Sequence, residues 1–169
     1  DRPEVTARVI DATIQALRAG TPGLLGLHLE GPHLDPRRAG AHDLTLIRPL
    51  QDDDLTLLCA AARDLPVLMV TLAPEAATPD QIARLADAGA LVSLGHSDCS
   101  LETARAAFAA GARVATHLFN AMSQMAHRAP GLVGAVLSGD AHAGLIADGI
   151  HVDPAALAVA LRARGSGLF

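Results

Sequence analysis

The sequence predicts an α/β fold, because short apolar segments alternate along the chain with helical patterns. Five segments rich in Leu or β-branched residues are expected to be strands, at residues 23–30, 66–72, 90–95, 113–118 and 143–148. Helical patterns predict helices at residues 5–18, 55–63, 82–88, 101–110 and 155–164. A strand followed by a helix, repeated in this way, indicates parallel strands joined by right-handed crossovers. We therefore expect a buried parallel sheet.

Residues that start and stop helices stand at the expected boundaries. Ser, Thr and Asp side chains accept hydrogen bonds from the free amides of the first turn, and proline has no amide to leave unpaired. These start signals are residues 52–54, Thr78 with Pro79 and Gln81, Ser100, and Asp153 with Pro154. Glycine is favoured just after a helix, where the left-handed conformation is common. Gly89, Gly111 and Gly165 stand at such positions.

The number of strands leaves two architectures open. A (β/α)₈ barrel takes typically ~250 residues, whereas five strands and their helices fill this chain of 169 residues. On this count the chain is either most of a barrel or a whole open doubly wound sheet. It begins at Asp1 and runs directly into a helical pattern without a targeting segment. This start is expected to be an interior point of a longer chain.

Composition excludes several classes of function. Half of the residues are apolar, 18% are charged and the formal net charge is −5, so neither nucleic acid nor an anionic membrane surface is expected as a partner. The charge favours a small-molecule ligand instead. Every basic residue is Arg, which excludes a lysine Schiff base and a lysine that bridges two metals. The apolar runs are too short to cross a membrane. Cys59 and Cys99 form no CxxC motif or disulfide framework, which predicts a reduced, cytoplasmic protein.

Three predicted strands end in side chains that bind metals. Glu30 ends the first strand before a Gly-Pro break, His96 ends the third and His117 ends the fourth. In a barrel the carboxyl ends of parallel strands meet around one axis, whereas in a flat sheet they spread along an edge. One carboxylate and two imidazoles suit a divalent metal such as zinc, with one position left for water. The pattern therefore favours the barrel and predicts a metal site.

Further polar residues lie in the loops that follow the strands. The loop at residues 32–49 is expected to be mostly solvated, and within it His42 could polarise a substrate carbonyl or position a water. Arg128 and the backbone amides near Asn120 and Ala121 suit an anionic group such as phosphate. The alternative is that Arg128 is an ordinary surface residue that binds no ligand.

Four other histidines are less tightly defined by the pattern. His28 shares a face with Glu30 one layer deeper, where it could support the metal ligands or belong to the core. His151 ends the fifth predicted strand and could bind the same ligand as the loop residues. His127 and His142 are expected to lie at the surface.

Six motifs occur in order along the chain. They are HLEGP at 28–32, GAH at 40–42, GHS at 95–97, THLFNAM at 116–122, Arg128 with PG at 130–131, and ADGIH at 147–151. In this order and spacing they resemble the N-acetylglucosamine-6-phosphate deacetylases of the metal-dependent amidohydrolase superfamily. The resemblance implies a partial (β/α)₈ TIM barrel of about five βα units, without the terminal barrel strands and the small β-sandwich domain. Residues 1–169 would be a fragment of a single catalytic barrel domain.

The resemblance also implies a reaction and a set of site residues. Glu30, His96 and His117 would hold a divalent ion, with zinc expected first and iron or another divalent ion as alternatives. His42 would be a catalytic residue that contacts the acetamide carbonyl. The substrate-binding residues would be His42, Ala41, Asn120, Ala121, Arg128 and His151. The reaction would be hydrolysis of N-acetylglucosamine 6-phosphate to acetate and glucosamine 6-phosphate, in amino sugar catabolism, by a cytoplasmic homodimer.

Parts of the family pattern fall outside these residues. The general-base aspartate of the family would lie beyond Phe169, and the histidines that bind a second metal in some members would precede Asp1. The number of metal ions therefore stays open. Two other functions remain compatible with the residues. One is a different barrel amidohydrolase that acts on cyclic amides or nucleobases and needs no arginine for a phosphate, and the other is a non-catalytic sugar-phosphate or metal binder.

Overall fold

The strands form one parallel sheet. A computed structural model describes residues 2–169, and the prediction made for Asp1 lies outside them. The strands are β1 (Leu27–Glu30), β2 (Leu68–Leu72), β3 (Leu91–Leu94), β4 (Val114–Ala115) and β5 (His142–Ala143). They pair in the order β1-β2-β3-β4-β5, each parallel to the next. The predicted α/β class with a parallel sheet is confirmed.

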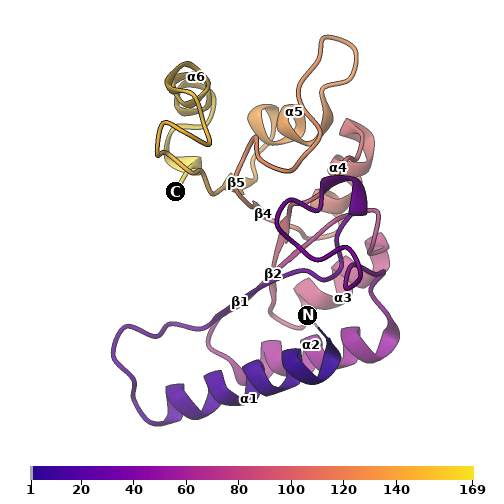
Figure 1. Cartoon of the computed structure of the whole chain (residues 1–169), viewed down its shortest axis with the longest axis vertical. Coiled ribbons are helices and arrows are strands. Elements are labelled where there is room, and N and C mark those ends of the chain that lie inside the picture. The colour runs from indigo at the N-terminus through magenta and orange to yellow at the C-terminus, as the bar shows by residue number, and fades with distance from the viewer. Residues whose placement is uncertain (1) are drawn as a thin grey trace.

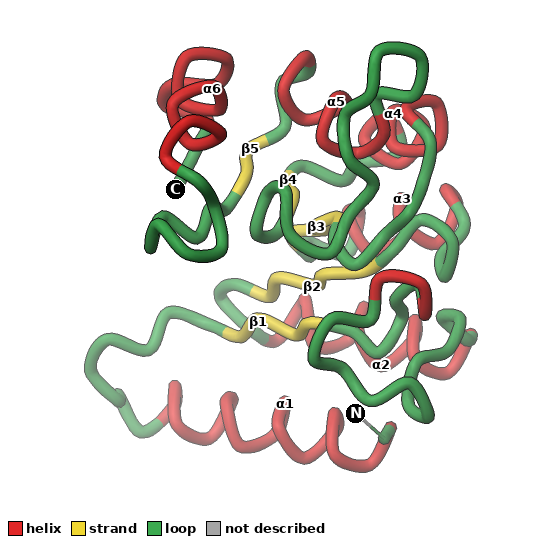
Figure 2. The backbone as a smooth tube through the Cα atoms, turned by 45° about the horizontal axis from the view of Figure 1, so that its top comes forward, coloured by secondary structure: helices red, strands yellow, loops and turns green. Residues whose placement is uncertain are grey.

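The helices lie on the outer side of this sheet. They are α1 (Pro3–Arg18), α2 (Asp52–Asp64), α3 (Pro79–Asp87), α4 (Leu101–Ala109), α5 (Gly131–Ser138) and α6 (Pro154–Arg164), with short 3₁₀ helices η1 (Pro36–Arg38) and η2 (Gly165–Gly167). Each α-helix contacts the next one along the chain. Figures 1 and 2 show them around an arc of strands, with α1 and α6 at its two ends. A doubly wound sheet would carry helices on both faces, so this arrangement is part of a (β/α)₈ barrel.

Alternate side chains of the strands pack against the helices. Val92 and Leu94 of β3 are completely buried in the hydrophobic core, and Val70 and Leu72 of β2 are buried beside them. Burying one such side chain stabilises the fold by about 1.5–3 kcal/mol. Successive side chains of a strand point to opposite faces. The intervening residue Ser93 therefore faces the inner side of the arc, away from the helices.

The predicted capping residues stand at the helix starts, with one shift. Thr78 accepts a hydrogen bond from the backbone N–H of Gln81, whose side chain accepts one from the N–H of Thr78. The other side-chain caps predicted from the sequence are Ser100 for α4 and Asp153 for α6. Helix α2 begins three residues earlier than predicted, at Asp52, because Gln51 forms a capping box with Asp54.

Helix α5 is absent from the sequence prediction. The first six of its residues are buried, so it is apolar on all sides and lacks the amphipathic period by which the other helices were recognised. It has eight residues and fills the crossover between β4 and β5. Among residues 2–169, no helix combines the length and the apolar character needed to pass through a membrane.

The last two strands are shorter than predicted. β4 ends at Ala115 and β5 at Ala143, whereas strands were expected over residues 113–118 and 143–148. Beyond β5, Gly144 still bonds to Ala115 and Leu118, and from Leu145 the backbone bonds to the end of the chain, where the N–H of Leu145 donates to the carbonyl oxygen of Phe169. His142 is exposed as predicted, although it lies within β5 rather than before it. Residues 144–148 therefore follow β5 as a loop.

Candidate metal centre

Three predicted side chains meet at the carboxyl ends of β1, β3 and β4. Glu30 is the last residue of β1, and His96 and His117 each follow their strand by two residues. Oε1 of Glu30 lies 3.0 Å from Nε2 of His96 and 3.0 Å from Nε2 of His117, and the two Nε2 atoms are 3.0 Å apart. We call these three side chains the ligand triangle. The arc of strands thus brings together donor atoms from three separate loops.

Uncommon backbone conformations turn the two histidines toward Glu30. The hydroxyls of Ser93 and Thr116 bond to each other on the inner face, so strict alternation would send His96 and His117 to the opposite face. Both histidines instead have positive φ, 47° for His96 and 37° for His117. The other non-glycine residues with positive φ within residues 2–169 are Phe119 and Ala121. This conformation costs energy and clusters at functional sites, so its concentration around the ligand triangle indicates a functional role.

Backbone carbonyls determine which ring nitrogen of each histidine carries the proton. Nδ1 of His96 donates to the carbonyl oxygen of Arg38 at 2.8 Å, and Nδ1 of His117 donates to that of Asn120 at 3.1 Å. A carbonyl only accepts, so in the neutral ring the proton lies on Nδ1 and Nε2 keeps its lone pair. Two ring lone pairs and a carboxylate oxygen at 3.0 Å repel one another unless positive charge lies among them. The donor set therefore fits a divalent cation.

The charge state of the ligand triangle agrees with this fit. If Nε2 of each ring carries a proton in place of a cation, His117 and His96 can donate hydrogen bonds to Oε1 of Glu30, and such bonds hold the pKa of the Glu30 carboxyl far below its usual value, although burial acts in the opposite direction. Burial disfavours the charged form of His117, but the hydrogen bond and the charge of Glu30 raise its pKa above the usual value. Glu30 is therefore ionised at neutral pH and attracts positive charge.

His42 is the fourth side chain at this place. Its ring meets that of His96 edge to face, with the ring centroids 4.6 Å apart. Glu30, His42 and His96 can each offer one donor atom within 4.8 Å of the others. Burial, and then the nearby His96, lower the pKa of His42. The His42 ring is therefore mainly neutral at pH 7 and can donate one hydrogen bond beside the ligand triangle.

A row of polar groups crosses the inner face of the strands just before their carboxyl ends. Nε2 of His28 lies 2.7 Å from Oγ1 of Thr71, which lies 2.6 Å from Oγ1 of Thr116, which lies 2.6 Å from Oγ of Ser93. Thr71 and Ser93 are completely buried, whereas His28 is exposed on the open inner face. His28 is therefore not a core residue, and its hydrogen bond joins it to this row rather than to the ligand triangle.

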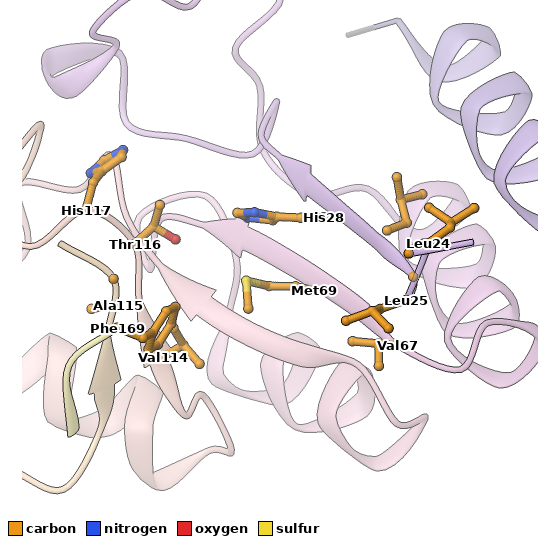
Figure 3. Close-up of a pocket in the computed structure, with 14 residues that line it drawn as sticks. Leu24, Leu25, His28, Val67, Met69, Val114, Ala115, Thr116, His117 and Phe169 are labelled. Carbon is orange, nitrogen blue, oxygen red and sulfur yellow. The ribbon is translucent and has the colours of Figure 1, made fainter. Parts of the chain in front are cut away.

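An apolar pocket of about 480 Å³ lies on the inner face of the arc. Figure 3 shows His28, Met69 and Thr116 projecting from the strands beside it, with His117 at one end. Most of the remaining lining consists of Leu, Val, Ala and Gly residues together with Phe169. Such a lining suits contact with apolar side chains rather than with a charged sugar phosphate. The polar site is thus confined to the carboxyl ends of the strands.

Three of the predicted substrate-binding residues lie in the loops that carry the cluster. Ala41 directly precedes His42, and Asn120 and Ala121 follow His117. The loop after β1 closely approaches the loops after β3 and β4, as a Cβ on Gly40 would lie 3.2 Å from Cε1 of His96 and 3.9 Å from Cβ of Ala121. Gly40 has a φ of 58°, so this approach requires a glycine.

Arg128 and His151 are not bonded to the ligand triangle or to His42. Arg128 is exposed in the loop before α5, and it makes no hydrogen bond or ion pair within residues 2–169. His151 is also exposed, and its Nδ1 lies 2.6 Å from Oδ2 of Asp148. That hydrogen bond lowers the pKa of Asp148 to about 2. A role for Arg128 and His151 in phosphate binding therefore stays a prediction.

The long loop after β1 is less solvated than predicted. His33 and Asp35 are each only 3% exposed. They are tolerated there because their polar atoms are satisfied locally, with Asp35 accepting hydrogen bonds from the backbone and the guanidinium of Arg37. The sequence also gave no indication of Arg38, whose carbonyl orients His96. A contact made by a backbone atom leaves no residue-type signal in a sequence.

Comparison with known proteins finds that the chain is similar to amino sugar deacetylases. The N-acetylgalactosamine-6-phosphate deacetylase of Shewanella sp. (strain ANA-3) is 41% identical over 98% of this chain and 42% of its own length. The N-acetylglucosamine-6-phosphate deacetylase of Homo sapiens is 42% identical over 98% of this chain and 43% of its own length. The crystal structure of N-acetylglucosamine-6-phosphate deacetylase from Pasteurella multocida matches with a TM-score of 0.95 at 37% identity, over 99% of this chain and 44% of that one. This chain is homologous to the N-acetylglucosamine-6-phosphate deacetylases.

The homology confirms the predicted resemblance and the partial deacetylase fold. The chain spans about two fifths of the length of the curated deacetylases it matches. No family model matches the chain. A second deacetylase structure, a mutant from Mycobacterium smegmatis, is in complex with N-acetyl-D-glucosamine-6-phosphate. It matches with a TM-score of 0.88 at 36% identity, over 99% of this chain and 44% of that one.

Proposed function

We propose that this chain is the metal-binding part of a hydrolase that deacetylates N-acetylglucosamine 6-phosphate, and that residues 1–169 belong to one catalytic barrel domain. The observation that carries the proposal is the ligand triangle of Glu30, His96 and His117, with its donor atoms 3.0 Å apart. Homology to deacetylases along nearly the whole chain supports this reaction over that of other barrel amidohydrolases.

The ligand triangle would hold the divalent ion, with zinc as the expected metal. Two imidazoles and one carboxylate are donors that zinc accepts while keeping a position for water. When bound, such an ion supplies a water of lowered pKa and positive charge for the amide carbonyl oxygen. The chain itself prepares the ligands, because the carbonyls of Arg38 and Asn120 hold the Nδ1 protons and leave both Nε2 lone pairs facing Glu30.

His42 would act on the acetamide group of the substrate. A neutral imidazole that donates a hydrogen bond to the carbonyl oxygen stabilises the negative charge that develops there during attack by water. The lowered pKa of His42 supports the neutral form. Its edge-to-face contact with His96 fixes the position of the ring relative to the ligand triangle.

The sugar phosphate would be bound by the loops after β4 and β5. The backbone N–H of Asn120 already donates to the carbonyl oxygen of His117, and Nδ2 of its side chain donates to that of Leu118 at 3.5 Å, which leaves the N–H of Ala121 and the second proton on Nδ2 for a ligand. Arg128 would add a positive charge from an exposed position, and His151 would add Nε2, which donates a hydrogen bond when both ring nitrogens carry protons, because its Nδ1 faces the carboxylate of Asp148. The Mycobacterium smegmatis deacetylase in complex with N-acetyl-D-glucosamine-6-phosphate supports a ligand of this kind.

The test measures metal content and acetate release by the longest natural polypeptide that contains this chain. We expect the purified protein to contain zinc or another divalent metal and to release one acetate per N-acetylglucosamine 6-phosphate consumed. Chelation should abolish the release, and zinc should restore it. Full activity without metal would contradict the proposed metal site. A metal-bound protein that binds the sugar phosphate without releasing acetate would instead be the non-catalytic binder.

N-Acetylgalactosamine 6-phosphate is a second candidate substrate. The relative from Shewanella, which is 41% identical, is named for that sugar. The two sugars differ in the configuration of one hydroxyl group, so the metal and the acetamide contacts would serve both. The ratio of kcat/KM for the two phosphorylated sugars decides which of them this protein prefers.

A further inference from the structure

Charged side chains hold the loop after β1 against the loop after β3. Nε of Arg38 donates to Oδ1 of Asp98 at 2.8 Å, and NH2 of the same guanidinium lies 2.6 Å from that oxygen. NH1 of Arg37 lies 3.3 Å from the other carboxylate oxygen, Oδ2. Asp98 follows His96 by two residues, and Arg38 provides the carbonyl that accepts from the His96 ring. We call the whole cluster the arginine clamp: Asp35, Arg37, Arg38, Glu75 and Asp98.

A carboxylate from a third loop fixes the backbone directly after His96. Oε1 of Glu75 accepts from the backbone N–H of Asp98 at 2.8 Å, and Oε2 accepts from the hydroxyl of Ser97 at 2.7 Å. Ser97 is completely buried. Glu75 lies after β2, so the loops of three consecutive strands meet around this one backbone segment. The segment cannot shift without breaking hydrogen bonds to buried groups.

The arginine clamp also reaches the main chain and the ring of His96. The backbone N–H of Asp35 donates to the carbonyl oxygen of His96 at 2.9 Å, and the carbonyl oxygen of Arg38 accepts from Nδ1 of the ring. Asp35 caps η1, and its carboxylate accepts from the backbone N–H of Arg37. One short 3₁₀ turn therefore holds His96 at two points. The orientation of that turn depends on the ion pairs that anchor it.

We propose that Arg38 and Asp98 are positioning residues for His96, and that their ion pair sets the ring orientation on which the affinity of the site for a divalent cation depends. This inference rests on the metal site proposed above. Arg38 and Asp98 are 36% and 29% exposed, and single ion pairs at such positions contribute little to folding. The effect is expected on cation binding instead. The ion pair connects Arg38, whose carbonyl orients the His96 ring, to Asp98 in the segment that carries His96.

The size of the effect follows from the length of this connection. Groups that bond directly to a metal-ligating histidine typically change metal affinity by roughly 10- to 100-fold when they are removed. Neither substitution removes the Arg38 carbonyl itself, so the loss should be smaller. We expect about fivefold weaker binding, below that range.

The chain contains a matched control pair. Arg48 and Asp54 form a two-point ion pair between the same loop and α2, with side chains 29% and 12% exposed. Neither residue bonds to His96. Asp54→Asn therefore removes a comparable carboxylate charge from α2, where it pairs with the same loop, and should leave cation affinity unchanged.

The experiment titrates Co²⁺ into the metal-free form of the longest natural polypeptide that contains this chain. Visible absorption reports the Kd and the d–d spectrum of the bound ion, and urea unfolding without metal reports stability. We expect Asp98→Asn and Arg38→Gln each to weaken Co²⁺ binding about fivefold and to shift the d–d bands. The double variant should be no weaker than either single one, because both changes break the same contact.

Equal Co²⁺ affinity and equal spectra for Asp98→Asn, Arg38→Gln and Asp54→Asn would overturn the positioning role and leave the metal site standing. A wild-type protein that binds no Co²⁺ would overturn the metal site and the inference together. If a single variant does not fold, the exchanged pair Arg38→Asp with Asp98→Arg decides. Wild-type Co²⁺ affinity in the exchanged pair supports the inference. A folded exchanged pair that binds Co²⁺ as weakly as the single variant that does fold overturns it.

Discussion

The surface at the carboxyl ends of the strands has two sides, and contacts within this chain hold the side chains of one side more firmly than those of the other. On the metal side, which comprises residues 30–54 and 93–121, His96 is 5% exposed and its ring and backbone are held by hydrogen bonds. On the phosphate side, residues 124–151, Arg128 and His151 are exposed, and the bond of His151 to Asp148 is local. The chain thus holds the predicted metal ligands in place, together with the proposed phosphate contacts Asn120 and Ala121 beside them, whereas the predicted phosphate contacts Arg128 and His151 are exposed and not bonded to them.

Backbone strain follows the same division. The non-glycine residues with positive φ within residues 2–169 all lie on the metal side, at His96, His117, Phe119 and Ala121. Such conformations persist only where surrounding contacts hold them. Exposed loops without those contacts cannot sustain the strain, and on the phosphate side positive φ occurs only at Gly131 and Gly149. Rigid ligand placement and adaptable substrate contacts are therefore expected to respond differently to substitution.

The largest expected effect comes from removing the shared carboxylate of the metal side. Glu30→Gln keeps the shape of the side chain but removes the charge that both histidines face. We expect divalent-ion affinity to fall by at least about 100-fold, since groups that merely support a ligand already account for 10- to 100-fold. Titration calorimetry with zinc measures the loss. Glu102→Gln on the exposed first turn of α4 is the control, and a loss below tenfold for Glu30→Gln would contradict the ligand assignment.

The next effect tests the phosphate side. Arg128→Gln removes a charged hydrogen-bond donor worth about 1.5–3 kcal/mol, which corresponds to roughly tenfold to hundredfold weaker binding of the phosphorylated sugar. Metal affinity and binding of unphosphorylated N-acetylglucosamine should not change. Equal losses for both sugars would favour an amidohydrolase without a phosphate-binding arginine. A parallel loss of metal affinity would show that the two sides are not independent.

Much of this division was predictable from sequence, but the ring orientations were not. Glu30 stands at the end of a strand before a Gly-Pro break, and period-2 alternation places its side chain on the inner face. His96 and His117 break that alternation, and the positive φ that redirects them has no residue-type signal. Their meeting was predictable only from the barrel and from the order of the motifs.

Burial of polar groups and placement of apolar helices were also beyond the sequence. A loop containing His33 and Asp35 has a hydrophilic composition, so its burial became apparent only once the hydrogen-bond partners were known. Helix α5 is apolar on all sides, which removes the period that identifies an amphipathic helix. For Arg128 and His151 the sequence indicates side chains that could bind an anion, but it does not show how far these loop residues lie from the other site residues.

The polar row beneath the metal side should affect stability more than binding. Thr116→Val keeps the side-chain shape and removes the hydroxyl that contacts both Thr71 and Ser93. Thr71 keeps its bond to His28, whereas the buried hydroxyl of Ser93 loses its partner, which costs about 1–3 kcal/mol in the free energy of unfolding. Urea unfolding measures the loss, with Thr56→Val at an exposed position of α2 as the control. An unchanged unfolding midpoint would show that the row is not energetically coupled.

The smallest expected effect concerns the pH dependence of the ion pair that ties the metal-side loop to α2. The hydrogen bond from Arg48 is the main cause that lowers the pKa of Asp54 in the folded protein. A lowered folded-state pKa contributes stability above the unfolded pKa of about 3.9 and loses it as the pH falls through the folded value. The wild-type protein should therefore be more stable than Asp54→Asn by about 1 kcal/mol or less at pH 7. That advantage should disappear on acidification below about pH 4.

Urea unfolding of the metal-free protein at pH 7 and pH 3 measures this advantage without the contribution of a bound ion. Asp52→Asn is the control, because Asp52 lies on the same turn and its side chain makes no ion pair within residues 2–169. An advantage that stays constant or grows at pH 3 would have the wrong sign for an ionised Asp54. It would show that packing and capping, rather than the Arg48–Asp54 ion pair, anchor the loop to α2. Ion pairs would then anchor the metal side only around His96.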